Sequence, residues 1–168
     1  AEIWDKFIEI IYDRGNYISG LDDLLRIESA RKILDAACGT GFPAVELSNL
    51  GYEVSCSDGN REMLEKFNSK SQGKIVAKKL DWTELAQNYG QEFDAVLVRG
   101  NSLIYAASWN KDSINPNEAR TAILESLRNF YQVLKEGGFL YVDLYNKKEK
   151  PNSSDLGQII LNGNPENW

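Results

Sequence analysis

The spacing of hydrophobic and polar residues along this chain predicts strands that alternate with helices. Five short apolar runs have the length and composition of buried strands, at residues 32–37, 52–57, 74–79, 93–98 and 139–144. Apolar residues recur at helical spacing between and before them, at residues 3–12, 21–25, 43–50, 60–69 and 118–135. The alternation predicts an α/β fold in a single domain, with a mainly parallel sheet and helices on both of its faces.

The clearest helix of this pattern is the last one, over residues 118–135. Asn117 precedes it as a cap, and Gly137 and Gly138 follow it as a terminator. A short helical turn is also expected after Asp81. In such a fold, ligands bind outside the carboxyl ends of the strands, so the residues that follow each strand are the candidates for chemistry.

The first predicted strand leads into a glycine-rich turn, Asp35-Ala-Ala-Cys-Gly-Thr-Gly41. Gly39 and Gly41 remove side chains where the backbone bends sharply and approaches another molecule, and Pro43 suits the first turn of a helix. Asp58 comes at the end of the second predicted strand, where a carboxylate can accept hydrogen bonds from both hydroxyls of a ribose. Together these features predict a nucleotide pocket, although the glycine spacing departs from the G-x-G-x-x-G of dinucleotide-binding proteins.

The other three strand ends carry residues that suit the same pocket. In chain order they are Asp81 with Trp82, Arg99 to Ser102, and Tyr145 with Asn146. An indole offers a flat face to an adenine and a carboxylate accepts from its amino group, so Asp81 and Trp82 suit a single nucleoside. The alternative stays open that Asp81 caps the following short helix and Trp82 is a core residue.

Composition and charge narrow the classes of partner. The 168 residues are 42% hydrophobic, and 25 acidic against 19 basic residues give a net charge of −6. Such a surface repels nucleic acid and anionic membranes, and the apolar runs are too short to span a bilayer, so we expect a soluble, cytoplasmic protein that binds a small molecule. Histidine is absent, which excludes an imidazole base. Cys38 and Cys56 are expected to be buried and reduced, without a metal site.

These motifs resemble those of the class I S-adenosylmethionine-dependent methyltransferases, and the chain is similar in particular to the glycine and glycine/sarcosine N-methyltransferases. The matching segments are residues 35–41, the stretch from Asp58 to Met63, Asp81 with Trp82, residues 93–102 and residues 137–143. The resemblance implies a Rossmann-like class I methyltransferase fold, S-adenosylmethionine as cofactor and S-adenosylhomocysteine as product. It also implies direct in-line methyl transfer to a small amine, namely glycine, sarcosine or dimethylglycine, with betaine synthesis as a candidate role and no catalytic base.

The resemblance also assigns roles to individual residues. Trp4 and Arg14 have the spacing of the family's N-terminal contacts, so Trp4 would cover the methionine end of the cofactor and Arg14 would pair with its carboxylate. Without that spacing, Trp4 is expected to be a core residue and Arg14 a solvated charge. The other cofactor-binding assignments are Ala37 and Gly39 for the methionine part, Asp58 and Gly59 for the ribose, Met63 for the adenine face, and Asp81 and Trp82 for the adenine edge. The substrate-binding assignments are Asn101, Tyr105 and Tyr145, although Asn101 also suits an ordinary turn and Met63 a core position.

Two residues that would bind the acceptor substrate, Tyr145 and Arg99, differ from the residues that the family has at these positions. The family holds the substrate carboxylate with an arginine two residues after the acidic residue of the fifth strand, and Tyr145 stands there in this chain. Arg99 occupies a position that is aliphatic in the family, and it is a candidate both to contact the cofactor and to clamp the substrate carboxylate. As a clamp, Arg99→Ala would raise the KM for an amino acid acceptor and leave cofactor affinity unchanged. The alternative is an exposed strand-end arginine that pairs with a surface carboxylate.

The chain after the fifth strand is short for this fold, which normally continues with a helix and an antiparallel hairpin. We expect residues 1–146 to form the cofactor-binding domain, incomplete at its C-terminal end. Residues 147–168 are polar apart from Ile159-Ile-Leu161 and are expected to be a tail or the start of a region that covers the substrate. A methyltransferase for another small molecule, a non-catalytic module that binds S-adenosylmethionine, and assembly as a homo-oligomer all stay open.

Overall fold

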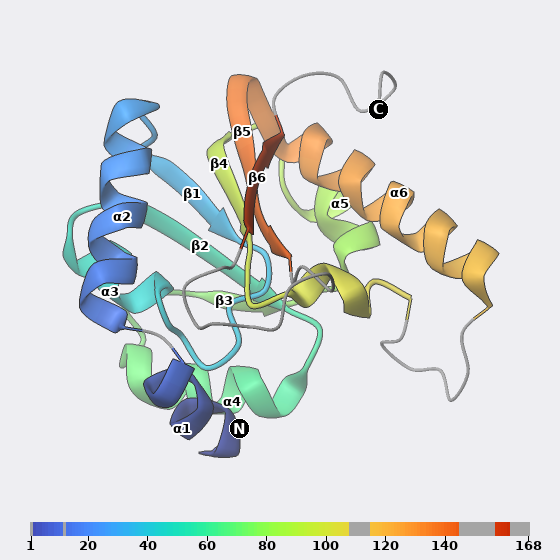
Figure 1. Cartoon of the computed structure of the whole chain (residues 1–168). Helices are drawn as coiled ribbons and strands as arrows, with labels where there is room; N and C mark the ends of the chain where they lie inside the picture. Colours follow the sequence, from blue (N-terminus) through green and yellow to red (C-terminus); the bar gives the residue numbers. More distant parts are fainter. Residues whose placement is uncertain (1, 12, 108–114, 145–156, 162–168) are drawn as a thin grey trace.

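A six-stranded sheet forms the centre of the computed structural model (Figure 1). The strands are β1 (Lys32–Asp35), β2 (Glu53–Asp58), β3 (Ala77–Lys79), β4 (Phe93–Val98), β5 (Leu134–Leu144) and β6 (Gly157–Leu161). Their order is β3-β2-β1-β4-β5-β6, with β1 to β5 parallel and β6 antiparallel to β5. The prediction of a mainly parallel sheet is therefore confirmed. The residues that the structure describes are 2–11, 13–107, 115–144 and 157–161.

Helices cover both faces of this sheet, as the alternating pattern predicted (Figure 1). On one face lie α2 (Arg14–Ile27) and α3 (Ala44–Asn49). On the other lie α5 (Leu85–Asn88) and α6 (Pro116–Val133). Within the described ranges, no helix combines the length and the apolar character that a membrane crossing requires.

The remaining helical segments lie near the carboxyl ends of the strands. α4 (Arg61–Ser71) packs with α3 and β2, and α1 (Glu2–Ile11) lies beside α4, where Asp5 and Lys70 form an ion pair at 2.6 Å (Figure 1). Two 3₁₀ helices follow β3 and β4, namely η1 (Trp82–Glu84) and η2 (Ser102–Tyr105).

The two faces of the central strands carry separate cores. Along β4, Ala95 and Leu97 pack with residues of α2 and α3, while Val96 and Val98 pack with residues of α5 and α6. All four side chains are fully buried. Burial on both faces requires a continuous apolar run rather than an alternating one, which is why the prediction of residues 93–98 matches β4 at both ends.

The boundary between α6 and β5 differs from the prediction. The side chain of Asn115 accepts a hydrogen bond from the N–H of Asn117 at 2.9 Å, so Asn115 is the cap and Asn117 belongs to the helix. The helix ends at Val133 and β5 begins at the next residue, which places Gly137 and Gly138 inside the strand. The expectation that these glycines terminate the helix was therefore wrong.

Gly138 serves the packing of two strands. A Cβ at this position would lie 3.0 Å from the carbonyl oxygens of Asp94 and Lys135. The register of β4 against β5 shifts at the same level, between Phe93 and Ala95. Gly138, which suggests a helix end in the sequence, is thus explained by the close approach of two backbones, a contact that local sequence does not reveal.

β6 is a strand that the sequence pattern did not predict. It contains the apolar run Ile159-Ile-Leu161 and pairs with residues Leu140 to Leu144 of β5. A short apolar run in a polar tail carries no strand signal of its own, and here the open edge of β5 provides its partner. Residues 145–156, including Tyr145, lie outside the described residues.

Asp94 ties β4 to its two neighbouring strands. Its carboxylate accepts hydrogen bonds from the N–H groups of Arg31 and Lys32, at 2.8 and 2.7 Å, and from the Lys135 ammonium at 2.7 Å. Burial alone would raise the pKa of Asp94, but these bonds outweigh burial and hold it below its usual value. We expect Asp94→Asn to lower the free energy of unfolding at neutral pH by about 1–2 kcal/mol.

The effect of Asp94→Asn should depend on pH in a defined direction. Because the folded-state pKa is depressed, the stabilisation is present above the unfolded-state pKa of about 4 and is lost as pH falls through the folded-state value. Urea denaturation of the wild type and the variant at neutral pH and below about pH 3 measures this. A stability difference that stays unchanged in acid would contradict the assignment to an ionised carboxylate.

Candidate functional site

The order of the strands defines one place for a ligand on this sheet. The order reverses between β1 and β4, so the chain leaves these neighbouring strands toward opposite faces and opens a crevice at their carboxyl ends. Residues 36–42, here named the glycine turn, follow β1, and Arg99, Gly100 and Asn101 follow β4. Two of the segments that the sequence marked for chemistry therefore meet at this crevice.

The glycine turn has the sharp backbone that its sequence predicts. Gly39 and Gly41 have φ values of 51° and 115°, in the region that favours glycine. The N–H of Gly41 donates to the carbonyl of Cys38 at 2.9 Å, and the N–H of Cys38 donates to the carbonyl of Ser57 at 3.1 Å. The turn is thus closed on itself and attached to the end of β2.

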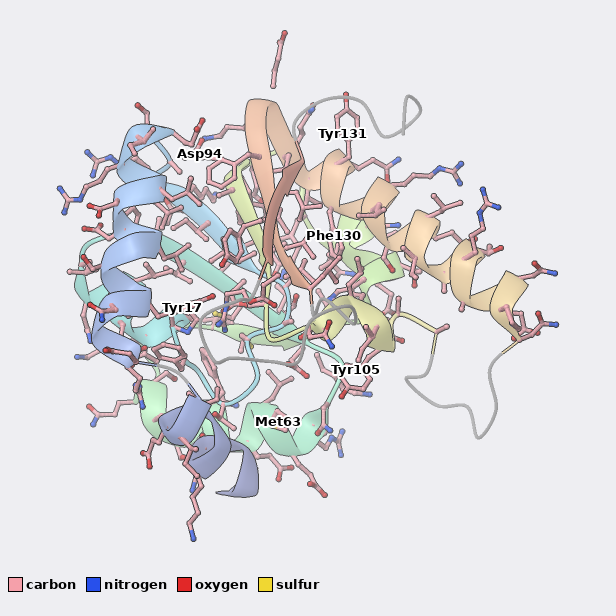
Figure 2. All side chains as sticks on the ribbon, viewed as in Figure 1. Tyr17, Met63, Asp94, Tyr105, Phe130 and Tyr131 are labelled. Carbon is pink, nitrogen blue, oxygen red and sulfur yellow. The ribbon has the colours of Figure 1, made fainter. Side chains whose placement is uncertain are left out.

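A pocket of about 290 Å³ opens beside this turn. Of the residues with a predicted role, it gathers Ala37, Gly39, Asp58, Met63, Arg99 and Tyr105. Four more lining residues, Cys38, Asn60, Gly100 and Ser102, belong to segments that the sequence had marked, and Ile8 and Phe42 had received no role. Figure 2 shows Met63 of α4 and Tyr105 of η2 in the lower half of the view, beyond the carboxyl ends of the strands. Sequence analysis missed Ile8 and Phe42, because no motif marks these two residues and only their position in the fold brings them to the pocket.

Asp58 supplies a carboxylate to the pocket wall. Its side chain is 6% exposed, and its two oxygens accept hydrogen bonds from the N–H groups of Gly39 and Asn60, both at 2.8 Å. Burial raises the pKa of Asp58, and these two hydrogen bonds oppose the rise. The cap of α4 is Asn60, whose side chain accepts from the N–H of Glu62 at 2.9 Å. Asp58 is therefore held at the base of the glycine turn, with each oxygen still able to accept a further hydrogen bond.

Trp82 occupies the core position that the sequence left as its alternative. Its side chain is 6% exposed, its indole N–H donates to the carbonyl of Ala36 at 2.6 Å, and its ring meets the edge of Phe130 with centroids 5.5 Å apart. Asp81 is exposed and is the N-cap of η1, and its N–H donates to the Glu84 carboxylate at 2.8 Å. Among the described residues that line the pocket, neither Asp81 nor Trp82 is present. The predicted contact of this pair with an adenine edge stays a prediction.

We expect Trp82→Phe to act on stability. The variant loses the hydrogen bond to Ala36 and part of the contact with Phe130, and should lower the free energy of unfolding by about 1–3 kcal/mol. Urea denaturation measures this, and titration with S-adenosylhomocysteine measures the effect on the site. A large loss of nucleoside affinity at unchanged stability would show instead that Trp82 touches the ligand.

Arg14 lies outside the pocket. It forms an ion pair with Glu46 and lies over the ring of Phe42, 4.6 Å from the ring centroid. It faces a second hollow of about 290 Å³, which has Ile8 and Phe42 in common with the pocket. A pairing of Arg14 with the cofactor carboxylate therefore requires the arginine to exchange its bond to Glu46, and it stays a prediction.

Four other assignments remain predictions for different reasons. The side chain of Trp4 and the whole of Tyr145 lie outside the described part of the structure. Gly59 and Asn101 adjoin pocket residues in the chain but are not among its described lining. Asn101 has a φ of 57°, and its N–H donates to the buried carboxylate of Asp143 at 2.7 Å, which holds the loop after β4 in place.

Arg99 is buried, so the expectation of an exposed strand-end arginine with a surface partner was wrong. Its side chain is 5% exposed and pairs at 3.4 Å with Asp35, which is 0% exposed. Its guanidinium also donates to the carbonyl of Phe42. Burial alone would lower the pKa of Arg99, but the charge of Asp35, together with contributions from Tyr17 and Asp143, outweighs burial and raises it. The role of Asp35 was missed, and the available signal was an acidic residue at the end of a buried strand.

The cysteines lie beneath the glycine turn. Cys38 and Cys56 are free and buried, as predicted. In the part of the chain that the structure describes, no group of three or more histidine, cysteine, aspartate or glutamate residues could hold a metal ion. The polar chemistry of the described pocket lining comes from Asp58, Asn60, Arg99, Ser102, Tyr105 and backbone groups.

A mainly parallel sheet with a glycine turn after β1 and a buried carboxylate at the end of β2 defines a Rossmann-like nucleotide-binding domain. Residues 33–138 match the family described as the methyltransferase domain, and the chain belongs to this family.

Known proteins agree with this assignment. The chain is 34% identical over 149 residues to a glycine/sarcosine N-methyltransferase of Aphanothece halophytica, covering 87% of this chain and 52% of the relative. It is 30% identical over 159 residues to the glycine N-methyltransferase of Oryctolagus cuniculus, with 87% and 52% covered. The chain thus spans about half the length of these curated relatives. A solved S-adenosylmethionine-dependent methyltransferase from Clostridium acetobutylicum shares the fold, with a TM-score of 0.64, 22% identity, and 85% of this chain and 55% of that chain covered.

Proposed function

We propose that this protein is an S-adenosylmethionine-dependent N-methyltransferase that acts on a small amine, with glycine, sarcosine and dimethylglycine as the candidate acceptors. Membership of the methyltransferase domain family supports the reaction class, and the names of the relatives support the acceptors. The observation that carries the proposal is the buried Asp58 carboxylate, which lines the pocket directly beside the glycine turn.

The described residues fit a nucleoside cofactor. Asp58 offers two carboxylate oxygens to the hydroxyls of a ribose, and Met63 offers a polarisable thioether to the face of a base. Ala37 and Gly39 bring backbone groups to the same wall, where the positive φ of Gly39 lets a ligand approach closely.

When bound, the cofactor supplies a methyl group that is already activated by its sulfonium. The protein then has to exclude water and hold the lone pair of the amine in line with that methyl group. Proximity and orientation of this kind can contribute about 7–11 kcal/mol to the lowering of a barrier. A chain without histidine suits such a mechanism, because the amine can lose its proton to water and no strong base is needed.

Calorimetry and a transfer assay test the proposal. Titration of the full-length protein with S-adenosylmethionine and S-adenosylhomocysteine should show binding of both. A labelled-methyl assay should then show transfer to at least one of glycine, sarcosine and dimethylglycine. Failure to bind either nucleoside would refute the cofactor assignment, whereas binding without transfer to any amine would refute the enzyme and leave a binding module.

The same proposal includes a cytoplasmic location and a role in betaine synthesis. The net charge of −6 suits a protein that stays in solution, and the resemblance to glycine/sarcosine N-methyltransferases supports the role. Cells that express the protein should accumulate methylated glycine under high salt. Unchanged pools of methylated glycine would contradict the role.

A further inference from the structure

Arg99 joins three segments that are distant in the sequence. Its guanidinium pairs with Asp35 at the end of β1 and donates to the carbonyl of Phe42 at the end of the glycine turn. Its charge also lies 5.9 Å from the ring centroid of Tyr17 on α2 and 5.8 Å from that of Phe42. One side chain from the end of β4 therefore contacts the strand before the glycine turn, the turn itself and the helix beside it.

The glycine turn is held from two sides. At its middle, the N–H of Gly39 donates to Asp58, which also lines the pocket. At its end, the carbonyl of Phe42 accepts from Arg99. A glycine loses more conformational freedom on ordering than any other residue, so contacts at both places help to keep one backbone shape in this segment. That shape forms the wall of the pocket.

The partners of Arg99 argue against a free carboxylate clamp. Asp35 is 0% exposed, and movement of the guanidinium toward an acceptor would leave this carboxylate buried without its counter-charge. Breaking a buried ion pair on one side is strongly unfavourable. The bond to Phe42 would be lost in the same movement. The guanidinium of Arg99 is thus already used by the ion pair with Asp35 and the hydrogen bond to Phe42.

We propose that Arg99 is a positioning residue that holds the glycine turn in its ligand-binding conformation, and that it does not clamp the carboxylate of the acceptor. This inference rests on the proposed function, because it concerns the affinity of the same pocket for its nucleoside. It reverses the kinetic expectation of the clamp hypothesis, since cofactor affinity should fall while the KM for the acceptor at saturating cofactor stays unchanged.

Two variants separate positioning from charge compensation. Arg99→Met leaves Asp35 buried and unpaired, so the protein should lose thermal stability together with affinity for S-adenosylhomocysteine. The double variant Arg99→Met with Asp35→Asn removes both charges and should regain much of the thermal stability. Since the bond to Phe42 is still absent, the double variant should bind S-adenosylhomocysteine at least about tenfold more weakly than the wild type.

Arg26→Met is the matched control. Arg26 lies on α2, is 67% exposed and pairs with Asp22 on the surface, so its replacement should change neither the thermal midpoint nor nucleoside affinity by a measurable amount. Calorimetry with S-adenosylhomocysteine and thermal unfolding are measured on the full-length proteins. The KM and kcat for the best amine of the wild type complete the comparison.

The outcomes distinguish this inference from the proposed function. If the wild type does not bind S-adenosylhomocysteine, the proposed function fails. If the wild type binds and the double variant binds equally well, Arg99 only balances charge and the inference is overturned. A rise in the acceptor KM with unchanged nucleoside affinity would overturn it in favour of the clamp.

Discussion

Asp58→Asn is expected to reduce the affinity for S-adenosylhomocysteine by at least about a hundredfold. The two oxygens of Asp58 already accept the N–H groups of Gly39 and Asn60, and their remaining lone pairs can accept two ribose hydroxyls. An asparagine has only one oxygen, so its amide group would meet one of the two N–H donors and could not accept from the ribose. The variant would therefore lose both the shape of the site and the two oxygens that accept hydrogen bonds from the ribose.

The stability of the Asp58 variant should change much less than its affinity. Burial raises the pKa of Asp58, so the ionised carboxylate costs stability at neutral pH, and removing its charge offsets the loss of one hydrogen bond. Calorimetry and thermal unfolding measure the two quantities separately. Asp23→Asn, at an exposed position on α2, is the matched control and should leave both unchanged. Equal nucleoside affinity in the wild type and Asp58→Asn would contradict the ribose assignment.

The affinity of the wild type for the nucleoside should also depend on pH. Under the proposed function, the ionised form of Asp58 would accept two ribose hydroxyls, and burial raises the folded-state pKa of Asp58. Affinity should therefore begin to fall at a higher pH than an ordinary aspartate, with its pKa of about 4, would give. Calorimetry across the acidic range checks this, and Asp58→Asn should remove the dependence.

Gly41→Ala is the second change with a large expected effect. Gly41 has a φ of 115°, which costs an alanine about 1–3 kcal/mol. Its new Cβ would lie 3.3 Å from the Val45 side chain and 3.4 Å from Phe67, a fully buried residue that has little room to move. The free energy of unfolding should fall by about 2–4 kcal/mol, and the turn should lose its nucleoside affinity because it can no longer keep its backbone shape.

Gly20→Ala provides the control with the opposite sign. Gly20 lies within α2, and nothing lies within 4 Å of a Cβ built there. The same substitution should raise the stability by up to about 1 kcal/mol, since alanine favours a helix over glycine. Urea denaturation of both variants gives the comparison. A destabilisation of similar size at the two positions would show that the backbone of Gly41 is not the cause.

The fold was predicted best where a strand is buried on both faces. β4 carries fully buried residues on alternate sides, so its apolar run has the same limits in the sequence and in the structure. β5 starts earlier than predicted because its first part contains Gly137 and Gly138, which have no strand signal of their own. The need for a glycine at position 138 follows from the approach of β4 at Asp94, a residue far away in the chain.

In the candidate site, too, local motifs were predicted from the sequence, whereas contacts between distant segments were not. The positive φ of Gly39 and Gly41 follows from a local motif, and the pocket gathers Ala37, Gly39, Asp58 and Met63 from two segments that the sequence had marked. Trp82 could not be placed from its neighbours in the chain, because both a nucleoside and a core offer an indole a flat apolar surface. Its hydrogen bond to Ala36 and its contact with Phe130 depend on how β1 and α6 pack.

By itself, the sequence determined the alternation of strands and helices, the sharp turn after β1 and the acidic residue at the end of β2. These features depend on residues that are neighbours in the chain, so periodicity and backbone preference are enough to specify them. Only the tertiary structure decided the partners of Arg99. Its charge can be buried because Asp35 and Phe42 reach it from β1 and the glycine turn, and this happens only when β1 and β4 lie side by side. A buried charge is stable where its partners are fixed, and their positions are a property of the whole fold.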